Sequence, residues 1–205
     1  MPTLTPAQIA TLLTPYLEAE GSPDLYPRLA TYLDLLLKWN ARTNLTAIRD
    51  PEEIVRRHFG ESLFAARHIS PETRTLLDFG SGAGFPGLPI QLLHPELTVT
   101  LAESQNKKAT FLREVLRTLG LKTEIWAARV EDMPHERRFG VVAMRAVDNM
   151  EAALAAAKAR IPPGGQLAVL TTAQQATTVQ QAPESAQLIP LPNSDSGVLF
   201  LQTFQ

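Results

Sequence analysis

Hydrophobic residues in the first 70 positions recur at intervals of three and four, which is the spacing of an amphipathic helix. The pattern predicts one helix from Thr5 to Gly21 and a second over residues 24–39. A third helix is predicted to begin at Asp50, which precedes a proline and stands three residues before a glutamate, as a capping residue does. The polar residues 40–49 are predicted to form an irregular connection.

After Ser70-Pro71 the pattern changes to short apolar runs that alternate with helical segments. Seven strands are predicted, the last two weaker than the rest, over residues 76–79, 97–102, 123–128, 139–144, 166–170, 186–191 and 198–204. Repeated β–α alternation implies a doubly wound, mostly parallel Rossmann-like α/β sheet, which the last two strands close in antiparallel fashion. The chain thus divides into an N-terminal helical extension, residues 1–70, and a core, residues 71–205, which we expect to be one compact unit.

The first predicted strand is followed by a loop with glycines at positions 80, 82, 84 and 87. Glycine is used where φ must be positive or where a ligand comes close to the backbone, so the loop indicates a cofactor site rather than a plain strand–turn–helix corner. Gly82, Gly84 and Gly87 match the G-x-G-x-x-G pattern of dinucleotide-binding folds. Asp78, Gly80, Gly82 and Gly84 instead resemble motif I of class I S-adenosylmethionine (SAM) methyltransferases.

Two prolines at the end of the loop and just after it favour SAM as the ligand. A pyrophosphate is bound by free N–H groups at a helix N-terminus, but Pro86 and Pro89 carry no N–H. SAM has no phosphate and does not need these donors. Glu103 ends the second predicted strand, where a carboxylate is expected to accept hydrogen bonds from ribose hydroxyls in either class. The alternative is that Glu103 is a solvated strand end.

Composition excludes several kinds of chemistry. The 205-residue chain has no cysteine, which excludes disulfides, thiolate metal sites and cysteine nucleophiles, and its four histidines lack metal-binding spacing. No apolar run approaches the roughly 20 residues of a membrane span, and the N-terminus lacks the apolar region of a signal peptide. We therefore expect a cytoplasmic protein with no bound metal and no membrane contact.

The charge distribution leaves a question about nucleic acid open. The net charge of −2 does not indicate a nucleic-acid partner. One predicted helix and its end are nevertheless strongly basic, with Glu114 as the single acid among Lys107, Lys108, Arg113, Arg117 and Lys122. A solvated helix face and an RNA-contacting face explain this segment equally well.

Further motifs carry a resemblance to a known family. They are Lys38-Trp39-Asn40 with Asn44-Leu45-Thr46, Arg49-Asp50-Pro51, His58 followed by Glu61 and Ser62, and Arg145-Ala146 after the fourth predicted strand. Together with the glycine loop they resemble the glucose-inhibited division protein B family, the bacterial 16S rRNA guanine-N7 methyltransferases, over nearly the whole chain. The glycine loop is generic to the class, whereas the Trp39–Thr46 and Arg145-Ala146 motifs are more specific.

The resemblance implies a monomeric, SAM-dependent enzyme that methylates N7 of a guanine in 16S rRNA, with the rRNA or the small ribosomal subunit as partner. By position it implies SAM contacts at Gly80, Phe85, Val130, Glu131 and Arg145, and analogy with the wider methyltransferase class gives Glu103 the ribose. The expected cofactor site also includes Asp78, Ser81, Gly82 and Gly84 of the glycine motif. Arg145 is the candidate catalytic residue, which could reach the SAM carboxylate or guanine O6. The alternative is an ion pair with Glu131 or Asp132, and Arg145→Ala is predicted to lower transfer while leaving folding intact.

His58, Asn40 and Asn44 are candidates for substrate contact. The favoured alternatives are that His58 packs the helical extension onto the core and that the asparagines fix the local loop through side-chain bonds to the backbone. The sequence departs from the family pattern at Glu61, usually Asp, and in carrying Phe at positions 79 and 85. It also has Leu170-Thr171-Thr172 where the family usually ends the fifth strand with Lys-Gly, a departure that concerns the RNA side.

The chemistry expected of such an enzyme is simple. Guanine N7 has a free lone pair and no proton, so its methylation needs no general base, and no nucleophile–base–acid triad is found in the sequence. We expect direct in-line transfer, promoted mainly by positioning. The rival interpretations are a SAM methyltransferase of a small molecule or protein, an NAD-dependent oxidoreductase, and a non-catalytic rRNA-binding module.

Overall fold

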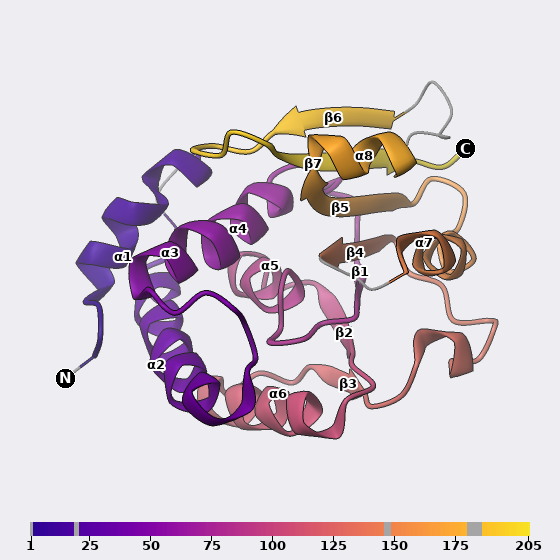
Figure 1. The fold of residues 1–205 in the computed structure, drawn as a ribbon. Helices are drawn as coiled ribbons and strands as arrows, with labels where there is room; N and C mark the ends of the chain where they lie inside the picture. The colour runs from indigo at the N-terminus through magenta and orange to yellow at the C-terminus, as the bar shows by residue number, and fades with distance from the viewer. Residues whose placement is uncertain (1, 19–20, 146–148, 180–185) are drawn as a thin grey trace.

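The computed structural model describes residues 2–18, 21–145, 149–179 and 186–205, and it contains a seven-stranded sheet in the order β3-β2-β1-β4-β5-β7-β6 (Figure 1). The strands are β1 Thr75–Phe79, β2 Thr98–Ala102, β3 Glu124–Trp126, β4 Val141–Arg145, β5 Gln166–Thr172, β6 Ala186–Pro190 and β7 Gly197–Thr203. Strands β1 to β5 pair in parallel, and β6 and β7 add an antiparallel edge. The predicted doubly wound sheet is confirmed, and its strand order reverses between β1 and β4.

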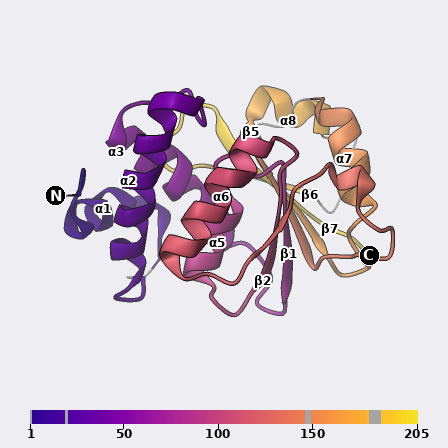
Figure 2. The same ribbon diagram turned by 90° about the horizontal axis from the view of Figure 1, so that it is seen from below.

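Helices cover both faces of the sheet (Figure 2). The helical segments are α1 Pro6–Leu13, η1 Thr14–Tyr16, α2 Leu25–Thr43, α3 Pro51–Ile54, η2 Val55–Gly60, α4 Glu61–Ala66, α5 Gly87–Leu93, α6 Asn106–Leu119, η3 Val130–Asp132, α7 Met150–Lys158 and α8 Ala173–Val179. Helices α5 and α6 lie on one face and α7 on the other, while α1 and α2 pack outside α5 and α6 (Figure 2). None of the helices in the described ranges is long and apolar enough to cross a membrane.

Alternation along β1 sends neighbouring side chains to opposite faces. Leu76 belongs to a hydrophobic cluster with residues of α1, α2, α5 and α6, whereas Leu77 and Phe79 join a smaller cluster beneath α7. Because the larger cluster contains residues from both sides of position 70, the helical extension and the sheet share one core. The boundary predicted there marks the point at which helices give way to strands.

Local signals set several helix ends as the sequence predicts. Thr5 and Gln8 form a reciprocal capping box, and Asp50 Oδ1 accepts the Glu53 N–H at 2.8 Å. Gly120 closes α6 with a φ of +64°.

The predicted end of α2 is wrong, because the helix continues past Trp39 to Thr43. Thr43 Oγ1 donates to the Trp39 carbonyl at 2.7 Å, and the helix ends only at Asn44, whose φ is +48°. Asn40 lies within the helix although its side chain bonds the loop that follows, so a polar residue at this point does not mark the end of the helix.

Candidate functional site

A cavity of about 430 Å³ opens at the carboxyl ends of β1 and β2 and beside the start of α7. Its size lies within the roughly 300–1,000 Å³ range of small-molecule sites, and its position is where ligands bind in doubly wound sheets. The cavity is lined by Phe79, Gly80, Ala102, Glu103, Ser104, Gln105, Lys108, Ala128, Arg129, Val130, Glu131, Asn149, Ala152 and Ala153.

Four of the ten predicted cofactor residues line this cavity, and they are Gly80, Glu103, Val130 and Glu131. The other six are not among its lining residues, and they are Asp78, Ser81, Gly82, Gly84, Phe85 and Arg145. The first five of these build the glycine loop and the strand that leads into it, while Arg145 lies at a second cavity.

Glu103 is a buried anchor for the glycine loop. The side chain is in a residue only 5% exposed; its Oε2 accepts the Gly82 N–H at 2.9 Å and its Oε1 accepts the Gln105 N–H at 2.6 Å. The alternative of a solvated strand end is therefore wrong. Each carboxylate oxygen has a second lone pair, so Glu103 can accept further hydrogen bonds from a ligand in the cavity.

Two of the glycines in the loop serve different purposes. Gly82 has a φ of +58°, and a Cβ there would meet no atom closer than 3.9 Å. A Cβ at Gly84 would lie 2.5 Å from both the Tyr32 hydroxyl and Leu88 Cδ1. Gly82 thus leaves open space beside the loop, whereas Gly84 permits close packing of the loop against α2 and α5.

The start of α5 does not offer free donors to a phosphate. The Gly87 N–H donates to Asp78 Oδ2 at 3.1 Å, the Leu88 N–H donates to the Gly84 carbonyl at 2.9 Å, and Pro86 and Pro89 have no N–H. The amides that would hold a pyrophosphate are therefore already bonded within the protein or absent. This geometry argues against the dinucleotide interpretation.

Asp78 lies fully buried beneath the loop. Its Oδ1 has no hydrogen-bond partner among the described residues, while Oδ2 accepts the Gly87 N–H. Burial, with a smaller contribution from the charge of Glu103, raises the pKa of the Asp78 carboxyl to about 7, and the hydrogen bond from the Gly87 N–H opposes this rise. The residue supports the loop from below rather than facing the cavity.

An aromatic stack holds the other side of the loop. Tyr32 is fully buried, its hydroxyl donates to the Ala83 carbonyl, and its ring lies 5.5 Å from that of Phe85. The His58 ring also stacks on Phe85, at 4.8 Å, and its Nε2 shares a 2.7 Å hydrogen bond with Thr46 Oγ1. Residues of the helical extension thus hold the glycine loop in place by ring stacking and a hydrogen bond.

His58 has the packing role that the sequence analysis favoured. Its Nδ1 is buried without a partner among the described residues, and desolvation together with the charges of Arg145 and Arg57 lowers its pKa to about 3. The ring is therefore neutral at pH 7. A contact between His58 and substrate stays a prediction.

Asn40 fixes the loop after α2 through side-chain bonds to the backbone, as the favoured alternative proposed, whereas the Asn44 side chain bonds the side chain of Arg49 instead. Asn40 is 3% exposed, donates from Nδ2 to the carbonyls of Thr46 and Ile48, and accepts the Thr46 N–H at 3.0 Å. Asn44 ends α2 in the left-handed conformation, and its Oδ1 accepts from Arg49 Nη2 at 2.7 Å.

The segment that carries Val130 and Glu131 is held by a residue that the sequence analysis missed. Arg160 is 3% exposed, and its guanidinium donates to the carbonyls of Val130, Met133 and Pro134. Nothing in the local sequence pairs position 160 with these carbonyls, because the contact depends on how α7 packs against the sheet.

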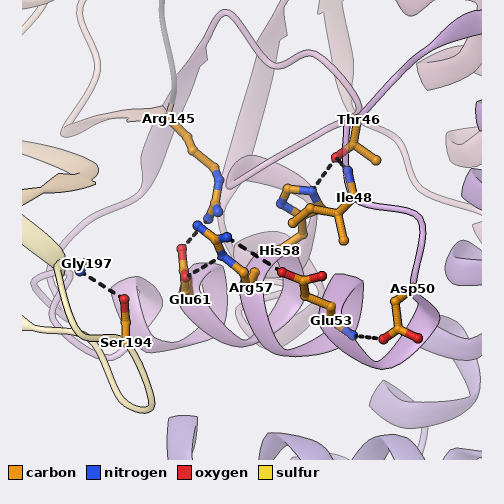
Figure 3. Close-up of polar contacts among 10 residues, drawn as sticks. All are labelled: Thr46, Ile48, Asp50, Glu53, Arg57, His58, Glu61, Arg145, Ser194 and Gly197. Atoms are coloured by element: carbon orange, nitrogen blue, oxygen red, sulfur yellow. Dashed lines mark hydrogen bonds and ion pairs between the residues drawn. The ribbon is translucent and has the colours of Figure 1, made fainter.

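Arg145 forms an ion pair with Glu61 and not with Glu131 or Asp132 (Figure 3). Arg145 Nη1 lies 2.7 Å from Glu61 Oε2, and the two side chains are only 13% and 8% exposed. Breaking a buried pair of this kind leaves an uncompensated charge. The expectation that Arg145→Ala leaves folding intact therefore does not fit the structure.

A second cavity, of about 180 Å³, lies at the carboxyl ends of β4 and β5. It is lined by Arg57, Glu61, Arg145, Met150, Leu170, Thr171, Thr172, Gln175, Leu191, Ser194, Ser196 and Gly197. The three residues that replace the usual end of the fifth strand, Leu170, Thr171 and Thr172, are thus part of this cavity. Ala146, the other half of the Arg145-Ala146 motif, lies outside the described residues.

Comparison with known proteins settles the family. A model of the family described as rRNA small subunit methyltransferase G matches residues 25–194. The chain belongs to this family. A relative from Xanthomonas campestris pv. campestris (strain B100), named ribosomal RNA small subunit methyltransferase G, is 38% identical over 164 residues, which are 79% of this chain and 76% of that protein. The membership confirms the resemblance in the sequence and the predicted class of enzyme, a SAM-dependent methyltransferase.

Solved structures support the fold. A putative O-methyltransferase from Klebsiella pneumoniae superposes with a TM-score of 0.63 at 15% identity and covers 92% of this chain and 93% of that one. A 16S rRNA N2 methyltransferase of T. thermophilus, solved in complex with AdoMet and guanosine, superposes with a TM-score of 0.59 at 21% identity and covers 72% of this chain and 43% of that one. The chain thus has the fold of these methyltransferases.

Proposed function

We propose that the protein transfers the methyl group of SAM to N7 of a guanine in small-subunit rRNA. Family membership supports the reaction class and the kind of substrate. The single observation that carries the site assignment is Glu103, a buried carboxylate that both anchors the glycine loop and lines the 430 Å³ cavity.

The residues around this cavity fit SAM. Glu103 accepts hydrogen bonds from the ribose hydroxyls, and Val130 and Glu131 lie beside the adenine. Gly80, with a φ of +70°, lets the backbone approach the ligand closely. A ligand without phosphate suits a site in which the amides at the start of α5 are already bonded to Asp78 and Gly84.

SAM, when bound, supplies an electrophilic methyl group on a sulfonium. The protein has to align the guanine with that methyl group and exclude water, because N7 carries a lone pair and loses no proton in the attack. Positioning of this kind can supply about 7–11 kcal/mol of barrier reduction. His58 does not act as a base, since its ring is packed against Phe85 and bonded to Thr46.

Arg145 belongs on the substrate side of the site. It lines the cavity at the ends of β4 and β5, and it forms an ion pair with Glu61. The start of α7 separates the two cavities, because Asn149 lines the first and Met150 lines the second. A cofactor in the first cavity and a base in the second would therefore be neighbours.

The experiment measures transfer of labelled methyl from SAM to deproteinised 16S rRNA, to intact 30S particles and to a panel of small molecules. Borohydride–aniline cleavage locates any N7-methylated guanine. We expect label in rRNA and cleavage at one guanine. Transfer only to small molecules, or affinity for NAD and none for SAM in calorimetry, contradicts the proposal.

A variant tests the site itself. Glu103→Gln has one carbonyl oxygen to serve two backbone amides and a ribose, and hydrogen bonds to a charged group are worth roughly 1.5–3 kcal/mol, so the affinity for SAM should fall about tenfold or more. The matched control is Glu136→Gln, an exposed glutamate outside the cavity, which should bind SAM as the wild type does. Unchanged SAM affinity in Glu103→Gln would contradict the assignment of this cavity as the SAM site.

A further inference from the structure

The second cavity contains two groups of opposite hydrogen-bonding character placed side by side. Arg145 offers donors only and Glu61 offers acceptors only, and Arg145 Nη1 lies 2.7 Å from Glu61 Oε2 (Figure 3). Both side chains line the cavity although each is almost entirely buried, at 13% and 8% exposure. The pair therefore presents a fixed donor–acceptor pattern to whatever enters.

Neither group is saturated by the residues that the structure describes around it. Arg145 Nη1 makes no hydrogen bond of good geometry with another described residue, although its distance from Glu61 is that of an ion pair. The other oxygen of Glu61, Oε1, lies 3.8 Å from Arg57 Nε, the one ion-pair contact that it makes within the described part of the chain. A carboxylate has about four acceptor positions and a guanidinium five donors, so both can bind a ligand without losing each other.

Resting on the proposed function, we propose that Arg145 and Glu61 read the Watson–Crick edge of the target guanine: Arg145 donates to O6, and Glu61 accepts the N1–H and the N2–H. Guanine carries this acceptor next to these donors on one edge. Adenine carries the reverse order, with an amino donor at position 6 and an acceptor at N1. Its donor would therefore face the donors of Arg145, and its acceptor would face the carboxylate of Glu61. The pair thus selects guanine.

This orientation leaves the reacting atom free. On the purine ring O6 stands between N7 and N1, so a base held at O6, N1 and N2 turns its N7 away from Glu61. Asn149 and Met150, adjacent in sequence, line the cofactor cavity and the base cavity respectively, so the free edge can face the cofactor across the start of α7.

The walls of the cavity suit a single base. Its volume of about 180 Å³ is below the roughly 300–1,000 Å³ typical of drug-sized ligands. Met150, Leu170 and Leu191 supply apolar surface, against which a base turned out of its stack can pack. Thr171 and Thr172 are neutral, so the positive charge of this cavity comes from Arg145 and Arg57.

The test combines a change in the base with a change in the protein. After the methylated guanine has been located, rRNA is prepared with inosine at that position, which keeps O6, N1–H and N7 but lacks the N2 amino group. For the wild type, kcat/KM on the inosine substrate should fall about tenfold or more, because a hydrogen bond to a carboxylate is lost.

In Glu61→Gln this discrimination should shrink towards a ratio of one, since the amide cannot accept both donors, while the affinity for SAM stays at the wild-type level. Glu61→Asp keeps the carboxylate and should keep the preference for guanine. The matched control is Glu53→Gln, which loses an exposed glutamate 3.7 Å from the same Arg57 but outside the cavity and should discriminate as the wild type does.

The outcomes separate the inference from the proposed function. Equal methylation of guanine and inosine by the wild type overturns the inference even if Glu61→Gln fails to fold. An unchanged ratio in a folded Glu61→Gln overturns it as well. Absence of methyl transfer to any rRNA would instead overturn the proposed function.

Discussion

Replacing Asp78 by asparagine should change how the stability of the protein depends on pH. The folded carboxyl has a pKa of about 7 against an ordinary value of 3.8, because it is fully buried beneath the glycine loop. Between these two pH values the folded state holds a proton that the unfolded state has released. The free energy of unfolding contributed by Asp78 therefore falls as pH rises through this window.

The magnitude follows from the two pKa values. Each tenfold change in acidity is worth about 1.4 kcal/mol, so moving the pKa from 3.8 to about 7 makes the ionised carboxyl cost about 4 kcal/mol once both states are deprotonated. Of this cost, about 2–3 kcal/mol develops between pH 5 and pH 8. Asparagine does not ionise, so the variant escapes this loss.

The assay is urea denaturation of wild type and Asp78→Asn at pH 5, 6, 7 and 8, followed by tryptophan fluorescence. The quantity to compare is the difference in unfolding free energy between the two proteins. The variant places an amide where Oδ1 has no partner among the described residues, which adds a penalty that is independent of pH. We expect the variant to gain about 2–3 kcal/mol on the wild type from pH 5 to pH 8.

A difference that stays constant over this pH range would refute the reasoning, because it would mean that Asp78 ionises alike in the folded and unfolded states. The control is Asp132→Asn, which removes an exposed carboxylate in η3 and should follow the wild-type profile.

Three further changes test the supports of the site. In His58→Gln the pH effect should have the opposite sign, because the folded pKa of His58, about 3, lies below its ordinary value of 6.5. The wild type therefore loses stability as the pH falls through this window. The variant, measured by the same urea series, should lose less. Tyr32→Phe leaves the buried Ala83 carbonyl without its donor and should cost about 1–3 kcal/mol together with a weaker SAM affinity, seen in denaturation and calorimetry; full SAM affinity would show that the loop holds itself. Arg160→Met removes a donor to three carbonyls and should destabilise the protein by about 2 kcal/mol or more and speed hydrogen exchange in residues 130–134, whereas unchanged exchange there would contradict the role assigned to it.

The sequence alone determined the features whose causes are local. The short apolar runs between helical segments predicted the strands, because a buried strand needs the same residue types in any sheet. Capping at Thr5 and Asp50 set two helix starts, and Gly120 set a helix end. The glycine loop follows the first predicted strand and Glu103 ends the second, so the position of both at the edge of the sheet could be predicted from the sequence.

The loop motifs were predicted in a different way. Asn40 was expected to bond the backbone that follows it, and it does so over six and eight residues. Such bonds need only a short stretch of chain in the right conformation. The same reasoning failed for the end of α2, because Asn40 lies within the helix while its side chain already bonds the loop that follows.

Only the tertiary structure decided which distant residues meet. Arg145 at the end of β4 meets Glu61 because the helical extension packs on the same core as the sheet, and a π-helical turn over Val55–Gly60 breaks the regular helical phase just before Glu61. The hydrogen bond from Tyr32 to the glycine loop and those from Arg160 to carbonyls in residues 130–134 arise in the same way. Periodicity reports that a residue is buried, but the partner of a buried polar group depends on packing between segments that the sequence keeps far apart.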